Sequence, residues 1–261
     1  MYTLNARLSM GVSDIICGST SAEDQNQLMI LIDIKGSNIF LEMEDNTMLD
    51  RYVQAEIQSP SPRKIVDGKI VYRTRLLEPA SRLRAIELGD FGSAVPGDAP
   101  RNGQFIQPSL YRAPEVILEK EWNYPIDIWN LATWAWHAFQ AKPMFEVVYP
   151  NHDSFSTCTH LAQITGLLGP PPPDFVEPDT IRNWIPEGCK IQKAKLEDME
   201  QRLEGENKEK FLNLIKAMLQ WRPEDRNTAR ELLEHPWLQG VFWPPGVLSQ
   251  LNSLTRQTCH R

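Results

Sequence analysis

Asp33-Ile34-Lys35-Gly36-Ser37-Asn38 is a polar loop inside the otherwise apolar stretch 27–41, and it is the part of the sequence that decides the fold. An apolar run, a polar loop and a second apolar run predict a strand, a loop and a strand. Asp90-Phe91-Gly92 forms a second such loop after the apolar residues Ile86 and Leu88. Three further motifs follow in the sequence: Ala113-Pro114-Glu115, Asp127-Ile128-Trp129 and Arg222-Pro223-Glu224-Asp225-Arg226. The occurrence of all five motifs in this order argues against a chance match.

Helices are expected from residue 111 onward. Asp127–Phe139 is apolar on every side and contains three tryptophans, which predicts a helix buried at the centre of a bundle. Asn227 is expected to cap the last of these helices. The other expected helices are Tyr111–Leu118, Thr159–Leu168, Lys208–Leu219 and Thr228–Leu233.

The remaining segments are irregular or inserted. Residues 1–26 show no periodic pattern, and the polar tail 241–261 is expected to be loose. Residues 42–85 are charged, contain Ser59-Pro60-Ser61-Pro62, and read as an insertion with one hairpin at Asp67-Gly68. Residues 27–240 would then form the main domain, which includes this insertion.

The composition is that of a globular protein. Hydrophobic residues make up 41% of the chain and charged residues 23%, and the net charge is -7. This acidic balance argues against direct nucleic-acid binding, and no apolar run is long enough to span a bilayer. We see no secretory signal, so a cytoplasmic or nuclear location is expected. The four cysteines show no metal-binding spacing and are expected to be reduced thiols; they are Cys17, Cys158, Cys189 and Cys259.

The five ordered motifs resemble those of the protein kinase family over roughly residues 27–240. The details look closest to the SR-protein kinase branch, especially its fungal-type members. The segments that resemble this branch are Asp33–Ile39, the insertion before Asp90, Asp90–Val95, Tyr111–Val116 and Leu161–Pro173. The resemblance implies a mainly α (α+β) fold: the helical C-lobe of a kinase, with short strands at the catalytic and Asp-Phe-Gly loops.

The resemblance also implies the site residues. Asp33 matches the carboxylate that orients the attacking hydroxyl and takes its proton, and Lys35 matches the cation beside the transferring phosphoryl group. Asn38 and Asp90 match the two magnesium ligands, and magnesium favours hard oxygen donors. Phe40 matches the apolar floor under adenine. ATP and Mg²⁺ are thus the expected cofactors, with Lys35, Asn38, Phe40 and Asp90 holding the nucleotide.

Other matching positions are structural. Glu115 and Arg226 match a pair that joins two parts of the lobe, and Asp127 matches a residue that holds the catalytic loop by its backbone. Two acidic clusters, Glu42–Asp45 and Glu197–Glu200, either attract an Arg-rich substrate or form a solvated acidic face. A protein substrate, Arg/Ser-rich by analogy with the branch, is the expected partner.

The sequence departs from the family in three places. It contains no Gly-x-Gly-x-x-Gly segment and no strand resembling Val-Ala-Ile-Lys, so the nucleotide-covering N-lobe is expected to be missing from these 261 residues. Leu31-Ile32 replaces the usual His-Arg before the catalytic aspartate. Asp90 follows Asp33 by 57 positions, a wider spacing than the family usually has.

Three functions therefore remain open. The chain is part of a serine/threonine protein kinase, shortened here and inactive alone; or it is an inactive lobe that binds proteins as a scaffold; or it gains an N-lobe from another chain. Retention of Asp33, Lys35, Asn38 and Asp90 favours the first, whereas the loss of the histidine favours the second. An exposed face where the N-lobe would dock is expected to promote association. The sequence identifies neither the substrate nor the oligomeric state.

Overall fold

The computed structural model of the chain describes residues 29–41, 47–75, 86–97, 99–102, 106–145, 148–149, 152–185, 189 and 191–239. The expected irregular segment 1–26 and tail 241–261 lie outside these residues. The chain divides into two compact units. The first combines residues 1–40 with 87–261, and the second covers 41–86, nearly the range of the expected insertion.

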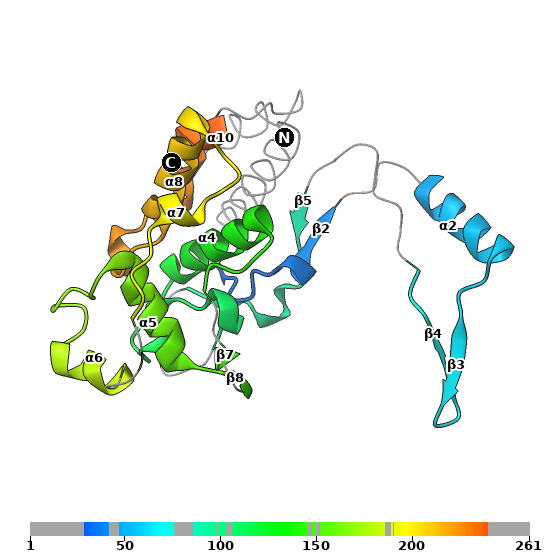
Figure 1. Ribbon diagram of the computed structural model, residues 1–261, viewed down its shortest axis with the longest axis horizontal. Helices are drawn as coiled ribbons and strands as arrows, with labels where there is room; N and C mark the ends of the chain where they lie inside the picture. Colours follow the sequence, from blue (N-terminus) through cyan, green and yellow to red (C-terminus); the bar gives the residue numbers. More distant parts are fainter. Residues whose placement is uncertain are drawn as a thin grey trace. The chain divides into compact units, whose positions relative to one another are not determined.

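Helix α4 (Pro125–Gln140) is the centre of the first unit, as its apolar composition predicts. Trp129, Trp134 and Trp136 are all buried, which confirms their expected place in the core. Helix α8 (Gly205–Met218) packs along α4, and α10 (Pro236–Gln239) packs on α8 (Figure 1). Phe211 of α8 lies 4.8 Å from the Phe139 ring centre and 5.1 Å from that of Trp237, so three helices share one aromatic cluster.

The smaller helices surround this centre. None of the described helices is both long and apolar enough to cross a membrane. Ser156 caps α5 through the amide of Thr159. The expected cap at Asn227 is wrong by one residue, because Thr228 and Glu231 form a reciprocal capping box on α9. The elements are α3 (Pro114–Ile117), α5 (Thr157–Leu168), α6 (Pro178–Trp184), α7 (Leu196–Met199) and α9 (Ala229–Leu233).

Four short strands frame the two polar loops. Strand β1 (Met29–Ile30) pairs antiparallel with β6 (Val95–Pro96), and β2 (Ile39–Leu41) pairs with β5 (Ile86–Leu88). The loop between β1 and β2 ends in a 3-10 turn, Gly36–Asn38, and the loop between β5 and β6 contains another, Phe91–Ser93. A separate pair, β7 (Val148–Tyr149) and β8 (His152–Phe155), precedes α5. The expected mainly helical fold with short strands is present.

The second unit contains one helix and one hairpin. Strands β3 (Arg63–Val66) and β4 (Lys69–Tyr72) pair antiparallel around Asp67 and Gly68, whose positive φ values of 51° and 74° make the tight turn that the Asp-Gly pair predicts. Helix α2 (Thr47–Gln58) was not expected from the charged sequence. No residue of α2 is buried.

Two cysteines that were expected to be free thiols are joined. Cys158, in the first turn of α5, forms a disulfide with Cys189, and their Cα atoms are 6.8 Å apart. The expectation of reduced thiols is therefore wrong for this pair. Helices α5 and α6 contact each other, and Cys189 follows α6 by five residues. Cys17 and Cys259 lie outside the described residues.

Candidate active site

The two polar loops are fastened to each other at both ends. Asp33 lies between β1 and β2, and Asp90 lies between β5 and β6. Because β1 pairs with β6 and β2 with β5, each loop enters and leaves beside the other. The amide of Gly89 also donates to the carbonyl oxygen of Asn38 at 2.9 Å. Residues 57 positions apart in the sequence are thus brought into one site.

Asp33 is the hub of the first loop. Its Oδ2 accepts from Lys35 Nζ at 2.7 Å and from Asn38 Nδ2 at 3.0 Å. The same Asn38 amide donates to the Asp33 carbonyl oxygen at 3.0 Å. Asp33 Oδ1 makes no hydrogen bond to any described residue. Within the described residues, the contacts of this loop therefore hold one of the two carboxylate oxygens of Asp33.

Helix α4 holds the backbone of this loop. Asp127 accepts from the amide of Leu31 at 2.7 Å and from that of Ile32 at 3.0 Å, which confirms the role expected of it. One turn on, Asn130 Oδ1 accepts from the Ile34 amide at 3.2 Å, and its Nδ2 donates to the Ile34 carbonyl at 2.8 Å. Sequence reasoning missed Asn130. The available signal was a polar residue inside an otherwise apolar helix, since a buried amide needs partners.

The backbone at Ile32 explains why α4 must hold the loop so firmly. Ile32 has a φ of 54°, which is costly for a β-branched residue and persists only when its surroundings enforce it. Burial raises the pKa of Asp127 from 3.8 to about 6, and the two amides that it accepts oppose this rise. The anionic form of Asp127 is thus kept by the same two amides that it positions.

The second loop offers hard oxygen donors. Asp90 has a left-handed backbone with φ 60°, and its exposed carboxylate makes no hydrogen bond or ion pair within the part of the chain that is described. Asn38 is buried, and among the described residues its Oδ1 accepts only from Ser37 Oγ, at 3.3 Å. One carboxylate and one amide oxygen suit Mg²⁺, which takes few protein ligands and keeps phosphate and water oxygens. The described residues contain no cluster of three His, Cys, Asp or Glu side chains that would hold a metal alone.

Two aromatic side chains at these loops, Phe40 and Phe91, are exposed. Phe40 is 52% exposed, and its ring covers Gly89 so closely that a Cβ there would lie 2.7 Å from Phe40 Cε2. A side chain at position 89 would therefore displace the Phe40 ring from the second loop. Phe91, in the Asp-Phe-Gly loop, is 58% exposed.

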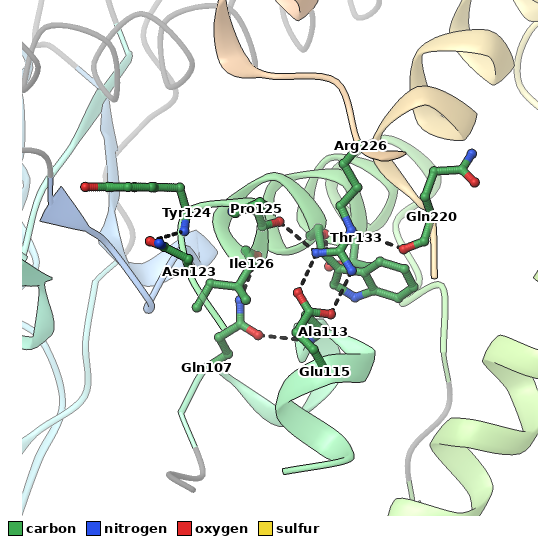
Figure 2. Close-up of polar contacts among 11 residues, drawn as sticks. Gln107, Ala113, Glu115, Asn123, Tyr124, Pro125, Ile126, Thr133, Gln220 and Arg226 are labelled. Carbon is green, nitrogen blue, oxygen red and sulfur yellow. Dashed lines mark hydrogen bonds and ion pairs between the residues drawn. The ribbon is translucent and has the colours of Figure 1, made fainter. Parts of the chain in front are cut away.

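The expected pair between Glu115 and Arg226 is present and buried. Arg226 Nη1 and Nη2 donate to the two carboxylate oxygens of Glu115 at 2.6 and 2.7 Å, and neither side chain is exposed (Figure 2). The remaining guanidinium donors reach the carbonyl oxygens of Pro125 at 2.9 Å and Gln220 at 3.1 Å. The guanidinium also stacks 5.1 Å from the Trp129 ring centre. Every charge in this pair is therefore compensated, as burial requires.

Gln107 is a buried residue that connects two backbone segments through its side-chain amide, and sequence reasoning missed it. Its Oε1 accepts from the Ala113 amide at 2.9 Å, and its Nε2 donates to the Ile126 carbonyl at 2.8 Å (Figure 2). Arg112 returns to the same segment, donating to the carbonyl oxygens of Ile106 and Gln107 at 2.9 and 3.1 Å. No sequence pattern predicts this, because a single Gln between Ile106 and Pro108 belongs to no motif that would name its partners.

The acidic cluster Glu197–Glu200 does not form one solvated face. Glu200 is buried, and its Oε1 accepts from Gln140 Nε2 and from the amides of Arg202 and Leu203. Glu197 pairs with Lys216 at 2.6 Å, which lowers its pKa by hydrogen bonding first and by attraction second. Asp198 is exposed and has no ion pair within the described residues, so the cluster offers a substrate one unpaired negative charge. Residues 42–45 of the other cluster lie outside the described part of the chain.

Comparison with known proteins agrees with this geometry. The family model described as the protein kinase domain matches residues 25–238. A serine/threonine protein kinase of Aspergillus fumigatus is 36% identical over 225 residues, which cover 81% of this chain and 56% of that protein. The dual specificity protein kinase CLK2 of Homo sapiens is 28% identical over 61% of this chain and 33% of its own length. The serine/threonine-protein kinase AFC3 of Arabidopsis thaliana is 26% identical over 81% and 52%.

The chain spans about half the length of the curated relatives it matches. The absence of an N-lobe stays a prediction from the sequence, and the family match begins at residue 25. The likeness to fungal kinases and to CLK2 agrees with the expected branch. The ordered motifs, the two fastened loops and the extent of the match place the chain in the protein kinase family.

Proposed function

We propose that this chain carries the lower half of a site that transfers a phosphoryl group from ATP to serine or threonine hydroxyls of proteins. The observation that carries the proposal is the geometry of Asp33. Its Oδ2 is held by Lys35 and Asn38, its Oδ1 is left for a substrate, and its loop is paired with the loop of Asp90. Phosphoryl transfer depends mainly on positioning and charge stabilisation, and these fixed contacts supply both.

In the proposed reaction the substrate hydroxyl donates its hydrogen bond to Asp33 Oδ1. The hydroxyl oxygen bonds to the γ-phosphorus, the bond from that phosphorus to the ADP oxygen breaks, and the hydroxyl proton passes to Asp33. Lys35, whose Nζ lies 2.7 Å from Asp33 Oδ2, is placed to neutralise charge on the transferring group. The hydrogen bond from Asn38 Nδ2 keeps the Asp33 carboxylate in position during this step.

Asn38 and Asp90 are the proposed holders of Mg²⁺, and Phe40 is the proposed platform for adenine. When bound, the metal would neutralise charge on the phosphate oxygens. The exposed Asp90 carboxylate and the nearby Asn38 Oδ1 lie on two loops joined by the Gly89–Asn38 hydrogen bond, so both can face one ion. The open ring of Phe40 gives a flat apolar surface for a base.

The substrate class and the setting are finer parts of the same proposal. A protein rich in Arg and Ser is proposed by analogy with the SR-protein kinase branch, and a cytoplasmic or nuclear location goes with it. The exposed rings of Phe40 and Phe91 support association through this face, either with an N-lobe or with a partner chain.

The competing proposal is a lobe that binds proteins without catalysis. The replacement of His-Arg by Leu31-Ile32 and the open Phe91 ring favour it. It leaves the ordered contacts among Asp33, Lys35 and Asn38 without a purpose, since a scaffold needs no such arrangement. For this reason the catalytic proposal is better supported.

Calorimetric titration of Mg²⁺-ATP into the purified chain tests the site directly. Asp90→Asn should weaken binding by about tenfold, which equals about 1.4 kcal/mol. Asp67→Asn is the matched control, because Asp67 also has a left-handed backbone but lies in the hairpin turn of the second unit. Equal affinities for the unaltered chain and Asp90→Asn, both dependent on Mg²⁺, would remove Asp90 from the metal site.

A further inference from the structure

The link between α2 and the hairpin of the second unit consists of two Ser-Pro pairs, Ser59-Pro60 and Ser61-Pro62. A residue before proline is biased toward an extended backbone. An extended, proline-marked segment is a form that the substrate cleft of a protein kinase can bind. Ser59 is exposed and Ser61 is partly exposed, so the segment lies at the surface of its unit.

The two serines differ in what their side chains contact. Ser61 Oγ donates to Glu56 Oε1 at 2.6 Å, and the Ser61 amide donates to Glu56 Oε2 at 2.9 Å. The hydroxyl of Ser59 makes no hydrogen bond to any described residue. Of the two serine side chains, that of Ser61 thus bonds to the last turn of α2, while Ser59 reaches the same turn through its backbone amide, which donates to the Ala55 carbonyl oxygen at 2.9 Å.

Arg75, which follows β4, joins the same contact. Its Nε pairs with Glu56 Oε1, and its Nη2 donates to the carbonyl oxygen of Ser59. Glu56 therefore connects the end of the helix, the Ser-Pro link and the end of the hairpin. The hydrogen bonds of Ser61 and then Arg75 lower the pKa of Glu56 to about 2, so the carboxylate is charged at any physiological pH.

From this arrangement we propose that Ser61 is a phosphorylation site, and that its phosphate takes Arg75 away from Glu56. The phosphoryl donor is a nucleoside triphosphate bound to a proline-directed protein kinase. Ser61 Oγ forms the new bond to the γ-phosphorus, the bond to the nucleoside diphosphate breaks, and the hydroxyl proton passes to the catalytic carboxylate of that kinase.

The consequence follows from charge. A phosphoserine carries about -1.5 to -2 at neutral pH. Placed where a neutral hydroxyl now donates to Glu56, it repels that carboxylate and has no proton left to donate. It also offers three oxygens to Arg75, and a guanidinium binds phosphate in a two-pronged manner. Arg63 and Lys64 at the start of β3 and Arg73 just after β4 add positive charge to the hairpin. Phosphorylation is therefore expected to replace the hydrogen bond from Ser61 Oγ to Glu56 by contacts between the Ser61 phosphate and Arg75.

The first test locates the phosphate. The purified full chain is incubated with an active proline-directed kinase and Mg²⁺-ATP, and phosphopeptides are mapped by mass spectrometry. Phosphate is expected on Ser61 in the unaltered chain and in the Ser59→Ala variant. In the Ser61→Ala variant, the peptide is expected to carry no phosphate at position 61. Phosphate on Ser59 alone, while a model Ser-Pro peptide is fully modified, would overturn the proposal.

The second test asks whether Arg75 changes partner. In ³¹P NMR titrations of the phosphorylated chain, Arg75→Gln should raise the second pKa of the Ser61 phosphate by about one unit, because a neighbouring cation favours the dianion. Glu56→Gln should lower the same pKa, since it removes a neighbouring negative charge. Arg51→Gln, on the exposed α2 surface, is the control and should leave it unchanged. Identical titrations for the unaltered chain and Arg75→Gln would overturn the exchange of partners.

Discussion

Arg226 and Glu115 meet through two parallel hydrogen bonds of 2.6 and 2.7 Å although 110 residues separate them in the sequence. Both side chains are fully buried, and the arginine also holds the backbone of Pro125 at the start of α4. The pair therefore joins α3, α4 and the turn before α9. Removing either partner would leave an unpaired buried charge.

Glu115→Ala and Arg226→Ala should each lower the free energy of unfolding by about 3–5 kcal/mol. The double variant should lose little more than either single one, because contacting partners are not additive. Urea denaturation of the three variants measures this. Losses that add in the double variant would mean that the two residues contribute independently.

The pKa of Asp127 gives a pH dependence with a definite sign. Burial raises this pKa from 3.8 to about 6, so the folded chain holds a proton that the unfolded chain has released over this interval. The stabilisation from that proton is complete below about pH 4 and is lost as the pH rises through 6. Two pKa units correspond to roughly 3 kcal/mol.

Asp127→Asn should flatten the slope of unfolding free energy between pH 4 and 6 that this residue causes. Denaturation at several pH values, with the unaltered chain beside the variant, measures the difference. Glu206→Gln on the exposed face of α8 is a suitable control, since its pKa is lowered by Lys210 rather than raised by burial. An unchanged slope in Asp127→Asn would place the titration on another group.

Gly166 is the helix position where a methyl group has no room. Its Cβ would overlap the backbone carbonyl oxygen of Gln192, and the carbonyl of Gly166 accepts from the Ala194 amide at 3.0 Å. Gly166→Ala should lower stability by about 1–3 kcal/mol through overpacking, against the gain that alanine usually brings to a helix. Gly36→Ala is the control, because its Cβ would make an ordinary contact 3.7 Å from Trp134 Nε1. Thermal melts of both variants test this: Gly166→Ala should melt at a lower temperature than the unaltered chain, and Gly36→Ala should not.

We expect the 261-residue chain alone to show no measurable phosphoryl transfer, even with an Arg/Ser-rich peptide. The proposed site has the lower groups, but these residues include no Gly-rich loop to cover the phosphates. A misplacement of the reacting groups of about 1 Å can cost a hundredfold in rate. A radiometric assay with Asp33→Ala as control measures this. Transfer that disappears in the variant would mean that no cover is needed.

The sequence was sufficient to predict those features of the fold that depend on the local pattern of apolar and turn-forming residues. The continuous apolar surface of Asp127–Phe139 sufficed to predict α4 at the centre, and the Asp-Gly pair sufficed for the hairpin turn. Helix α2 was missed because the charged residues around it suggested a loop, although Leu49, Val53 and Ile57 recur every four residues as on one face of a helix. All three of these side chains are exposed. Gln107 and Asn130 were missed because their role lies in contacts with backbone groups distant in the chain. A sequence shows that a residue is polar, but not which buried amide it will satisfy.

The pairing of β2 with β5 has a consequence for the history of this chain. Residues 41–86 leave the first unit at the end of β2 and return at the start of β5, so their two ends are already neighbours. Closing a longer loop between fixed neighbouring ends costs little more than closing a short one, about 0.6 kcal/mol for each doubling. This junction is thus a place where evolution can add, enlarge or replace a segment without moving Asp33 or Asp90, and where a foreign domain could be grafted by design.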